Sequence, residues 1–585
     1  PQMTENIRYD GSLKASVILK DLAPFVPALS RFEEPLDLNL VFSGHGKHLD
    51  CPTLRLTNHH GLMIAGEAAL SNWDAGMDMY IYGKLGNLTM TKEGINVLMT
   101  NLTGKVPPIL QRLDYIRFNG EAAGYLHDLT LTGLFHTGAG MVKTDVMMSI
   151  DEQSMSRTYS GSVASADLDL GKLLNQEKKF GKVDFNVELK GFNYKNRYPE
   201  SYIKGIISSF EYSQYQYENI MLDGVYKDGG FNGRLSMDDA NGSVQIDGNF
   251  NVAKTIPDFN LKASVKNLRP HDLHLSDKYE NASISLGLTA DFTGKSIDDM
   301  NGRISLDSLQ LNAPDEGGCF LDNLTITAGQ VSGEKELRIN SSFMTAVIRG
   351  DYSYHTIPAS VVKTVQRYIP SLLTIKDNMP EPHNNFQFDI CLENAEVLSK
   401  LFQIPLELYL PASLKGYFND GEEKLHVEGH FPEFRYNGTR YDSGVLFCEN
   451  PSDRFKCSLR GGMLMKSGAM LNFSVEANAK NDHLETTINW GNNTDVTYGG
   501  KFAADTRFFK TEGPHPILQA DINIQPTKVV LNDTVWNIHP SHIAIDSGRV
   551  FIDNFLFEHE DQYLRIDGKL TKKESDSCRV DLRNI

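Results

Sequence analysis

One seven-residue unit recurs along this chain of 585 residues and constrains its fold more than any other feature. Apolar residues at alternate positions lead to a glycine, and a further apolar residue follows two positions on. The unit occurs at 62–68, 79–85, 129–135, 244–250, 346–352, 425–431 and 564–570. A period of two places the apolar side chains on one face of a β-strand and the polar ones on the other. The sequence therefore predicts a sheet with one apolar and one polar face.

The glycine of the unit has two interpretations. Asp247 and Asp567 precede it in two copies and would suit the second residue of an Asp-Gly hairpin turn. The preceding residue is otherwise Ala, Tyr, Thr, Arg or Glu, which are poor turn formers, so a glycine inside a continuing strand fits every copy. There it would permit curvature or a close approach to the sheet. That the glycines mark bends in an ordinary β-sandwich remains open.

Turn signals separate the predicted strands. Asn-Gly and Asp-Gly pairs, such as Asn119-Gly120 and Asn241-Gly242, follow strands of about ten residues. This spacing favours an antiparallel meander. The best helical periodicity spans 358–373, and further helical segments are expected at 16–32, 108–118, 166–176 and 393–402. A proline-containing stretch from 374 to 385 suggests a joint, which would divide the chain into 1–373 and 374–585.

The length of the chain decides between architectures. A single core stops growing near about 250–300 residues. At about 12–15 residues per strand and turn, the chain holds roughly 35–40 strands, and open sheets beyond about 10 strands curl or split. We therefore predict a mainly β fold: an elongated, curled antiparallel sheet with an apolar inner face, a hydrophobic groove and a few short helices.

Charge and cysteine usage exclude several classes of function. The net charge of the chain is −18. Such an acidic chain lacks the basic stripe that binding to nucleic acid or to anionic lipid head groups requires. The six cysteines contain no C-x-x-C pair, although Cys448 and Cys457 could pair across a hairpin. No apolar run approaches the ~18–20 residues of a membrane helix, and no signal peptide opens the chain. Strand-like sequence at both ends suggests an internal piece of a longer protein.

No catalytic or metal-binding pattern is found. The segment Gly294-Lys295-Ser296 lacks the earlier glycine of a phosphate-binding loop, and neither G-x-S-x-G nor H-E-x-x-H occurs. The histidine pairs at 271–274 and 539–542 have no visible third ligand. We expect a protein that is not an enzyme and that needs no cofactor or metal.

Two stretches, 97–135 and 530–570, carry the features of a known family. The first contains Gly104-Lys-Val-Pro-Pro and Leu129-Thr-Leu-Thr-Gly, and the second contains Leu531-Asn-Asp-Thr-Val-Trp and Leu564-Arg-Ile-Asp-Gly-Lys-Leu. With the short helices expected at 166–174 and 266–271, they resemble the AsmA-like superfamily and its TamB-type members. The resemblance covers essentially the whole chain, but it rests on structural repeats and lacks the N-terminal membrane helix and the usual C-terminal end.

The resemblance implies a periplasmic bridge between the inner and outer membranes of a Gram-negative bacterium. It implies a groove that carries phospholipid acyl chains, a role in outer-membrane biogenesis, an inner-membrane anchor N-terminal to this segment, and an outer-membrane assembly barrel of the TamA or BamA kind as partner. No nucleic acid is expected.

Two functions remain as hypotheses. The first is a phospholipid conduit, and the second is a chaperone or scaffold module for outer-membrane β-barrel assembly or secretion with an Omp85-type partner, acting by strand addition. The residues expected to line the groove are Val244, Ile246, Phe250, Ile284, Leu286, Leu288, Leu425, Val427 and Phe431. The alternative for each is a place in a core between two sheets.

Overall fold

The structure is a computed structural model of the chain. It describes residues 7–22, 30–151, 153–154, 156–193, 200–278, 280–314, 317–373, 383–492, 498–512, 516–546, 549–570 and 577–584. The predicted joint begins at 374, and residues 374–382 lie outside this description, so the boundary between 1–373 and 374–585 stays a prediction.

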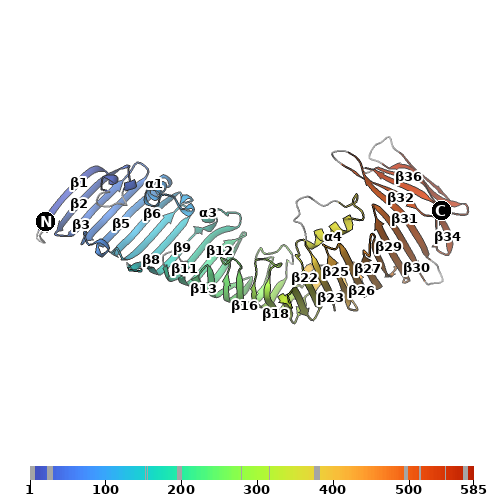
Figure 1. Ribbon diagram of the computed structural model, residues 1–585. Coiled ribbons are helices and arrows are strands. Elements are labelled where there is room, and N and C mark those ends of the chain that lie inside the picture. Colours follow the sequence, from blue (N-terminus) through green and yellow to red (C-terminus); the bar gives the residue numbers. More distant parts are fainter. Residues whose placement is uncertain are drawn as a thin grey trace. The chain divides into compact units, whose positions relative to one another are not determined.

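The fold is mainly β, with one antiparallel sheet of 38 strands and a few short helices. This confirms the predicted fold class. Most strands pair with the strands before and after them in sequence, as in a meander, and the exceptions include the β32–β35 and β34–β36 pairs near the C-terminal end. The chain forms two compact units, Pro1–Thr289 and Ala290–Ile585, with the boundary inside strand β17. Figure 1 shows the successive strands of each unit lying side by side.

The strands of the first unit, with the one that spans the boundary, are β1 Arg8–Ile18, β2 Pro35–His45, β3 His48–Thr57, β4 Leu62–Ser71, β5 Tyr80–Thr91, β6 Tyr115–Tyr125, β7 Asp128–Thr137, β8 Gly140–Asp151, β9 Ser156–Ala166, β10 Leu168–Asp169, β11 Phe180–Asn193, β12 Glu200–Tyr212, β13 Tyr215–Lys227, β14 Gly230–Asp239, β15 Gly242–Asn251, β16 Asp258–Leu268 and β17 Ser283–Thr293.

Those of the second unit are β18 Asn301–Asn312, β19 Cys319–Leu321, β20 Leu324–Val331, β21 Glu334–Ser341, β22 Met344–Asp351, β23 Asn385–Leu392, β24 Leu406–Leu408, β25 Ala412–Asn419, β26 Lys424–Tyr436, β27 Thr439–Glu449, β28 Phe455–Leu464, β29 Met470–Lys480, β30 His483–Asn492, β31 Gly499–Lys510, β32 Leu518–Ile524, β33 Thr527–Leu531, β34 Thr534–Ile538, β35 Ser541–Asp546, β36 Arg549–His559, β37 Gln562–Leu570 and β38 Cys578–Arg583.

The helices are short and partly match the predicted segments. They are α1 Lys92–Thr103, α2 Pro108–Gln111, α3 Leu170–Leu174, α4 Ile357–Gln366, α5 Glu396–Phe402 and the 3-10 turns η1 Leu19–Leu22 and η3 Gly76–Asp78. The helix predicted over 358–373 ends earlier because Pro370 disfavours a helical conformation of the residue before it. The segment at 16–32 begins as strand, and part of it lies outside the described residues.

All seven glycines of the repeated unit lie inside strands, which confirms the strand interpretation over the turn. At several of them the backbone of the adjacent strand occupies the space of a side chain. A Cβ on Gly66 would lie 2.1 Å from the carbonyl oxygen of Lys84, and one on Gly350 would lie 2.2 Å from that of Asn385. At Gly429 the nearest atoms are side chains of Phe431 and Leu414 instead, and nothing lies within 4 Å of the Cβ position of Gly83. The close approach at these glycines is thus made mostly by the sheet itself.

A disulfide joins Cys448 on β27 to Cys457 on β28, which are directly opposite each other in the register. The remaining four cysteines are free thiols. The pairing across a hairpin that the sequence allowed is therefore present.

Candidate apolar binding face

Directly opposed residues of an antiparallel pair point to the same face of the sheet, so the register defines rows of side chains that cross the strands. One such row, here called row A, crosses the first unit from β1 to β16 without a charged residue. Row A consists of Leu13, Leu40, Leu54, Gly66, Leu85, Gly120, Gly133, Thr144, Val163, Val187, Gly205, Leu222, Leu235, Ile246 and Ala263.

A second row runs parallel to row A, two residues from it along each strand except β3, where a bulge makes the separation three residues. Row B consists of Cys51, Ala68, Gly83, Ala122, Leu131, Val146, Gly161, Leu189, Ile203, Gly224, Gly233, Gly248 and Leu261. The glycines of the repeated unit on β4, β5, β7 and β15 all fall in these two rows. The repeat therefore produces a continuous, uncharged face, from which no side chain projects at the glycine positions.

The opposite face carries charge in the same register. Its central row, row D, consists of Glu67, Lys84, Glu121, Thr132, Asp145, Ser162, Glu188, Lys204, Asp223, Arg234, Asp247 and Lys262. Neighbours of opposite sign pair across strands; the Lys204 ammonium lies 3.2 Å from the Asp223 carboxylate. Exposed pairs of this kind add little stability. This face is therefore polar, whereas rows A and B carry no charged side chain.

Helices and one irregular segment cover one margin of the apolar face in the first unit. Ile95 of α1 and Leu173 of α3 form a buried cluster with Ile116 of β6. Further along, Leu273 is fully buried against Met237, and its carbonyl oxygen accepts a hydrogen bond of 2.8 Å from the Tyr217 hydroxyl. Figure 1 shows α1 and α3 along the same edge of the strands. Rows A and B lie beyond this covered margin.

Aromatic residues occupy the other margin of the apolar face. Tyr159, Tyr226, Phe231, Phe250 and Phe259 belong to one cross-strand row there, four residues from row A along each strand. The ring centroids of Phe231 and Phe250 are 5.8 Å apart, and Phe250 is 39% exposed. Of these residues, Tyr159 and Tyr226 have the polar tip that suits a boundary between apolar and aqueous surroundings, and the three phenylalanines extend the apolar face.

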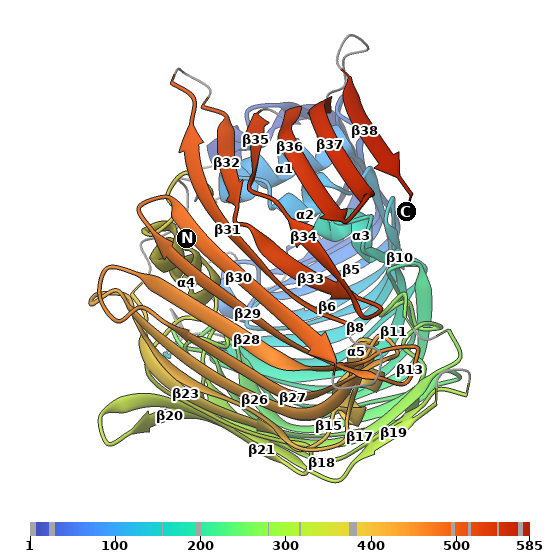
Figure 2. The same ribbon diagram turned by 90° about the vertical axis from the view of Figure 1, so that its right-hand side faces the viewer.

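The second unit repeats this arrangement. Its charge-free row, row C, consists of Ile304, Ile326, Ile339, Ala346, Ile390, Leu414, Gly429, Leu446, Leu459, Val475, Ile488 and Phe502. Helix α4 covers one margin, where Val361 packs against a buried cluster that contains Phe418. Figure 2 shows the strands of this unit from a second direction.

The surface area confirms that a large part of these faces has no second layer. The chain exposes 34738 Å². A compact monomer of 65.4 kDa would expose about 21,000 Å². The excess of about 14,000 Å² indicates that much of the sheet has no second layer over it.

The nine predicted lining residues divide between the two environments. Ile246 lies in row A, Phe250 at the aromatic margin, and Val427 and Phe431 at half-buried inward positions of β26. Ile284, Leu286 and Leu288 alternate along β17 and are half-buried. Val244 packs against the Leu273 cluster, Leu425 is buried in the cluster beneath α4, and Val427 packs against that same cluster. These three positions therefore lie at the covered margins of the apolar faces.

Helix α1 was not predicted from the sequence, although it is the longest helix that the structure describes. Thr91 caps it by accepting a hydrogen bond from the Gly94 amide, and Gly104 ends it in the left-handed conformation. Ile95 and Met99, spaced i and i+4, were the available signal. This spacing was hard to recognise because the sequence before Thr91 is strand-like and the first turn of the helix contains a glycine.

Other chemistry is sparse in the described part of the chain. No group of three or more His, Cys, Asp or Glu residues there could hold a metal ion. The paired histidines of the sequence have local partners instead: His539 contacts Glu558 at 2.6 Å, and His274 contacts the Ser213 carbonyl oxygen at 3.0 Å. Among the helices described, none has both the length and the apolar character needed to cross a bilayer.

Comparison with known proteins does not assign the chain to a group: no family model, no curated protein and no solved structure matches it.

Proposed function

We propose that the apolar face binds the acyl chains of phospholipids and conducts them along the sheet. The observation that carries this proposal is the continuity of rows A, B and C, which cross many strands without a charged side chain. Uncovered apolar area of this extent is rare in soluble monomers and marks a surface that binds an apolar partner.

The free-energy cost of exposing acyl chains to water favours a continuous apolar lining. Each CH₂ group moved into water costs about 0.8 kcal/mol, so two acyl chains of about sixteen carbons cost roughly 25 kcal/mol. An unbroken row removes most of that barrier at every step. The covered margin closes one side of the path, and the aromatic margin leaves the other open for a polar head group.

The proposed setting follows the resemblance to AsmA-like proteins: a periplasmic bridge between the two membranes that works with an outer-membrane assembly barrel. The Cys448–Cys457 disulfide is compatible with such an oxidising compartment.

A matched pair of positions on β15 tests the proposal. Photo-crosslinking residues at Ile246 and at the neighbouring Gln245 differ only in the face to which they point. Crosslinking in cells should capture phospholipid at Ile246 and not at Gln245. Mass spectrometry of the purified chain should also detect bound phospholipid.

Substitution gives the complementary result. Ile246→Asp places a carboxylate in row A and should lower lipid transfer, whereas Gln245→Asp should leave transfer unchanged. Capture of unfolded polypeptide in place of phospholipid at Ile246 would replace the conduit with the scaffold function.

A further inference from the structure

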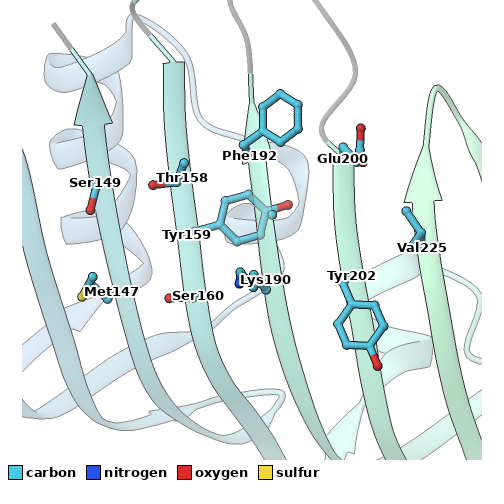
Figure 3. Close-up of a pocket in the computed structure, with 11 residues that line it drawn as sticks. Met147, Ser149, Thr158, Tyr159, Ser160, Lys190, Phe192, Glu200, Tyr202 and Val225 are labelled. Carbon is cyan, nitrogen blue, oxygen red and sulfur yellow. The ribbon is translucent and has the colours of Figure 1, made fainter.

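The charged face of the first unit is interrupted by a pocket. The pocket lies over β8, β9, β11, β12 and β13 and has a volume of about 510 Å³; most of its lining residues are on the face opposite to rows A and B, and Tyr159 and Gly191 of the aromatic margin also border it. Figure 3 shows Met147, Phe192 and Tyr202 projecting from neighbouring strands on this face. Pockets that hold small molecules have volumes of about 300–1,000 Å³.

The lining breaks the polar pattern of its surroundings. Row D, two to four residues away along these strands, consists of charged and hydroxyl side chains, yet Met147 is 44% exposed here, Phe192 43% and Tyr202 38%. Val225 lies directly opposite Tyr202 and extends the apolar wall. Large apolar side chains exposed together beside the charges of row D indicate a binding surface.

The polar groups of the lining divide into paired and unpaired ones. The Tyr202 hydroxyl donates to Asp223 at 2.8 Å, and Glu200 pairs with Lys227 at 2.8 Å. In contrast, the Lys190 ammonium has no ion-pair partner among the residues that the structure describes, and the side chain of Ser160, directly opposite, is likewise without a hydrogen-bond partner there. A cation and a hydroxyl are thus available beside apolar walls.

We propose that this pocket binds a small amphiphilic anion, with one carboxylate or a comparable acidic group on an aromatic or short alkyl body. The anionic group pairs with Lys190 and accepts a hydrogen bond from Ser160, while the body packs between Met147, Phe192 and Tyr202. Charge complementarity selects an anion because Lys190 is the unpaired charge of the lining. The pocket and the apolar face are separate sites, on opposite faces of the same strands.

Titration of the full chain with 2-naphthoate tests the proposal, with neutral 2-naphthalenemethanol as the matched ligand. Naphthoate should bind saturably. Lys190→Met should weaken naphthoate binding about tenfold, the loss of about one charge-assisted hydrogen bond, and should leave the binding of the alcohol unchanged. Phe192→Ala should weaken both ligands because it removes a shared wall.

Two control variants locate the bound probe. Lys262→Met removes a cation from row D outside the pocket and should not change naphthoate binding. Ile246→Asp alters the apolar face and should not change it either. The proposal is overturned if naphthoate does not saturate at millimolar concentration, if Lys190→Met and Phe192→Ala bind it as the parent chain does, or if Ile246→Asp abolishes binding, which would place the probe on the apolar face.

Discussion

The repeated glycine can be tested with two copies of the unit that lie on paired strands. Gly66→Ala places a Cβ 2.1 Å from the carbonyl oxygen of Lys84 and 3.0 Å from the Cα of Leu85. Both atoms belong to the backbone of β5, which is paired on both sides and cannot move freely. Gly83→Ala places a Cβ where nothing lies within 4 Å.

The expected magnitudes differ in sign. Overpacking against backbone costs about 1–3 kcal/mol, so Gly66→Ala should destabilise this part of the sheet by that amount. At Gly83 the same change reduces the conformational entropy of the unfolded chain, so it should be neutral or stabilise the fold by up to about 1 kcal/mol. Because both variants change glycine to alanine in a strand, the effect on the unfolded chain is shared, and the difference between them measures the native contact.

Hydrogen exchange is the suitable assay because an extended sheet opens locally. A loss of about 1–3 kcal/mol should speed exchange of the β4 and β5 amides about 5- to 150-fold in the Gly66→Ala chain, since each 1.4 kcal/mol is a factor of ten. Exchange in the Gly83→Ala chain should match or fall below that of the parent. Equal exchange in the two variants would refute the inference that these glycines admit the neighbouring strand.

Three further predictions follow from buried or paired side chains. Leu273→Ala should cost about 2–5 kcal/mol of local stability, seen as faster exchange at 269–277, because the side chain is fully buried; unchanged exchange would mean that this segment is not anchored there. Two arginines hold the pKa of Glu336 below its usual value, so its contribution to stability is present above the ordinary carboxyl pKa and is lost as the pH falls through the lowered one. Urea unfolding between pH 6 and pH 3 should therefore show a smaller acid loss for Glu336→Gln than for the parent, and an equal loss would exclude this role. Alkylation in denaturant without reductant should label four of the six cysteines, leaving Cys448 and Cys457 protected; six labelled thiols would contradict the disulfide.

The sequence predicted the fold class because alternation is a local property of each strand. It did not predict which residues meet across strands. Bulges shift the register between Leu85 and Leu88 on β5 and between Val41 and Ser43 on β2, and each shift changes every later partner. The rows that define the candidate site depend on those partners and became visible only in the structure.

The same reasoning explains why the sequence could not separate lining positions at the covered margin from those beyond it. Val244 and Ile246 have the same chemistry and alternate on one strand, so periodicity cannot distinguish them. What distinguishes them is Leu273, which is nearly thirty residues away in sequence and covers the margin where Val244 lies. The pocket on the charged face was missed for a related reason: Met147, Lys190 and Tyr202 are far apart in the chain and adjacent only across strands.

Parallel rows also determine how strongly a single charge can interrupt lipid movement. On β15 the positions beyond the covered margin are Ile246, Gly248 and Phe250, separated from one another by about 7 Å along the strand. An acyl chain displaced from row A by Asp at Ile246 can still contact Gly248 and Phe250, so the single variant should slow transfer without abolishing it. Adding Phe250→Asp places a carboxylate on each side of Gly248, and a chain passing there would desolvate one of them, which costs several kcal/mol. The double variant should therefore lose transfer almost completely, and a double variant no slower than Ile246→Asp would show that the rows do not act as parallel tracks.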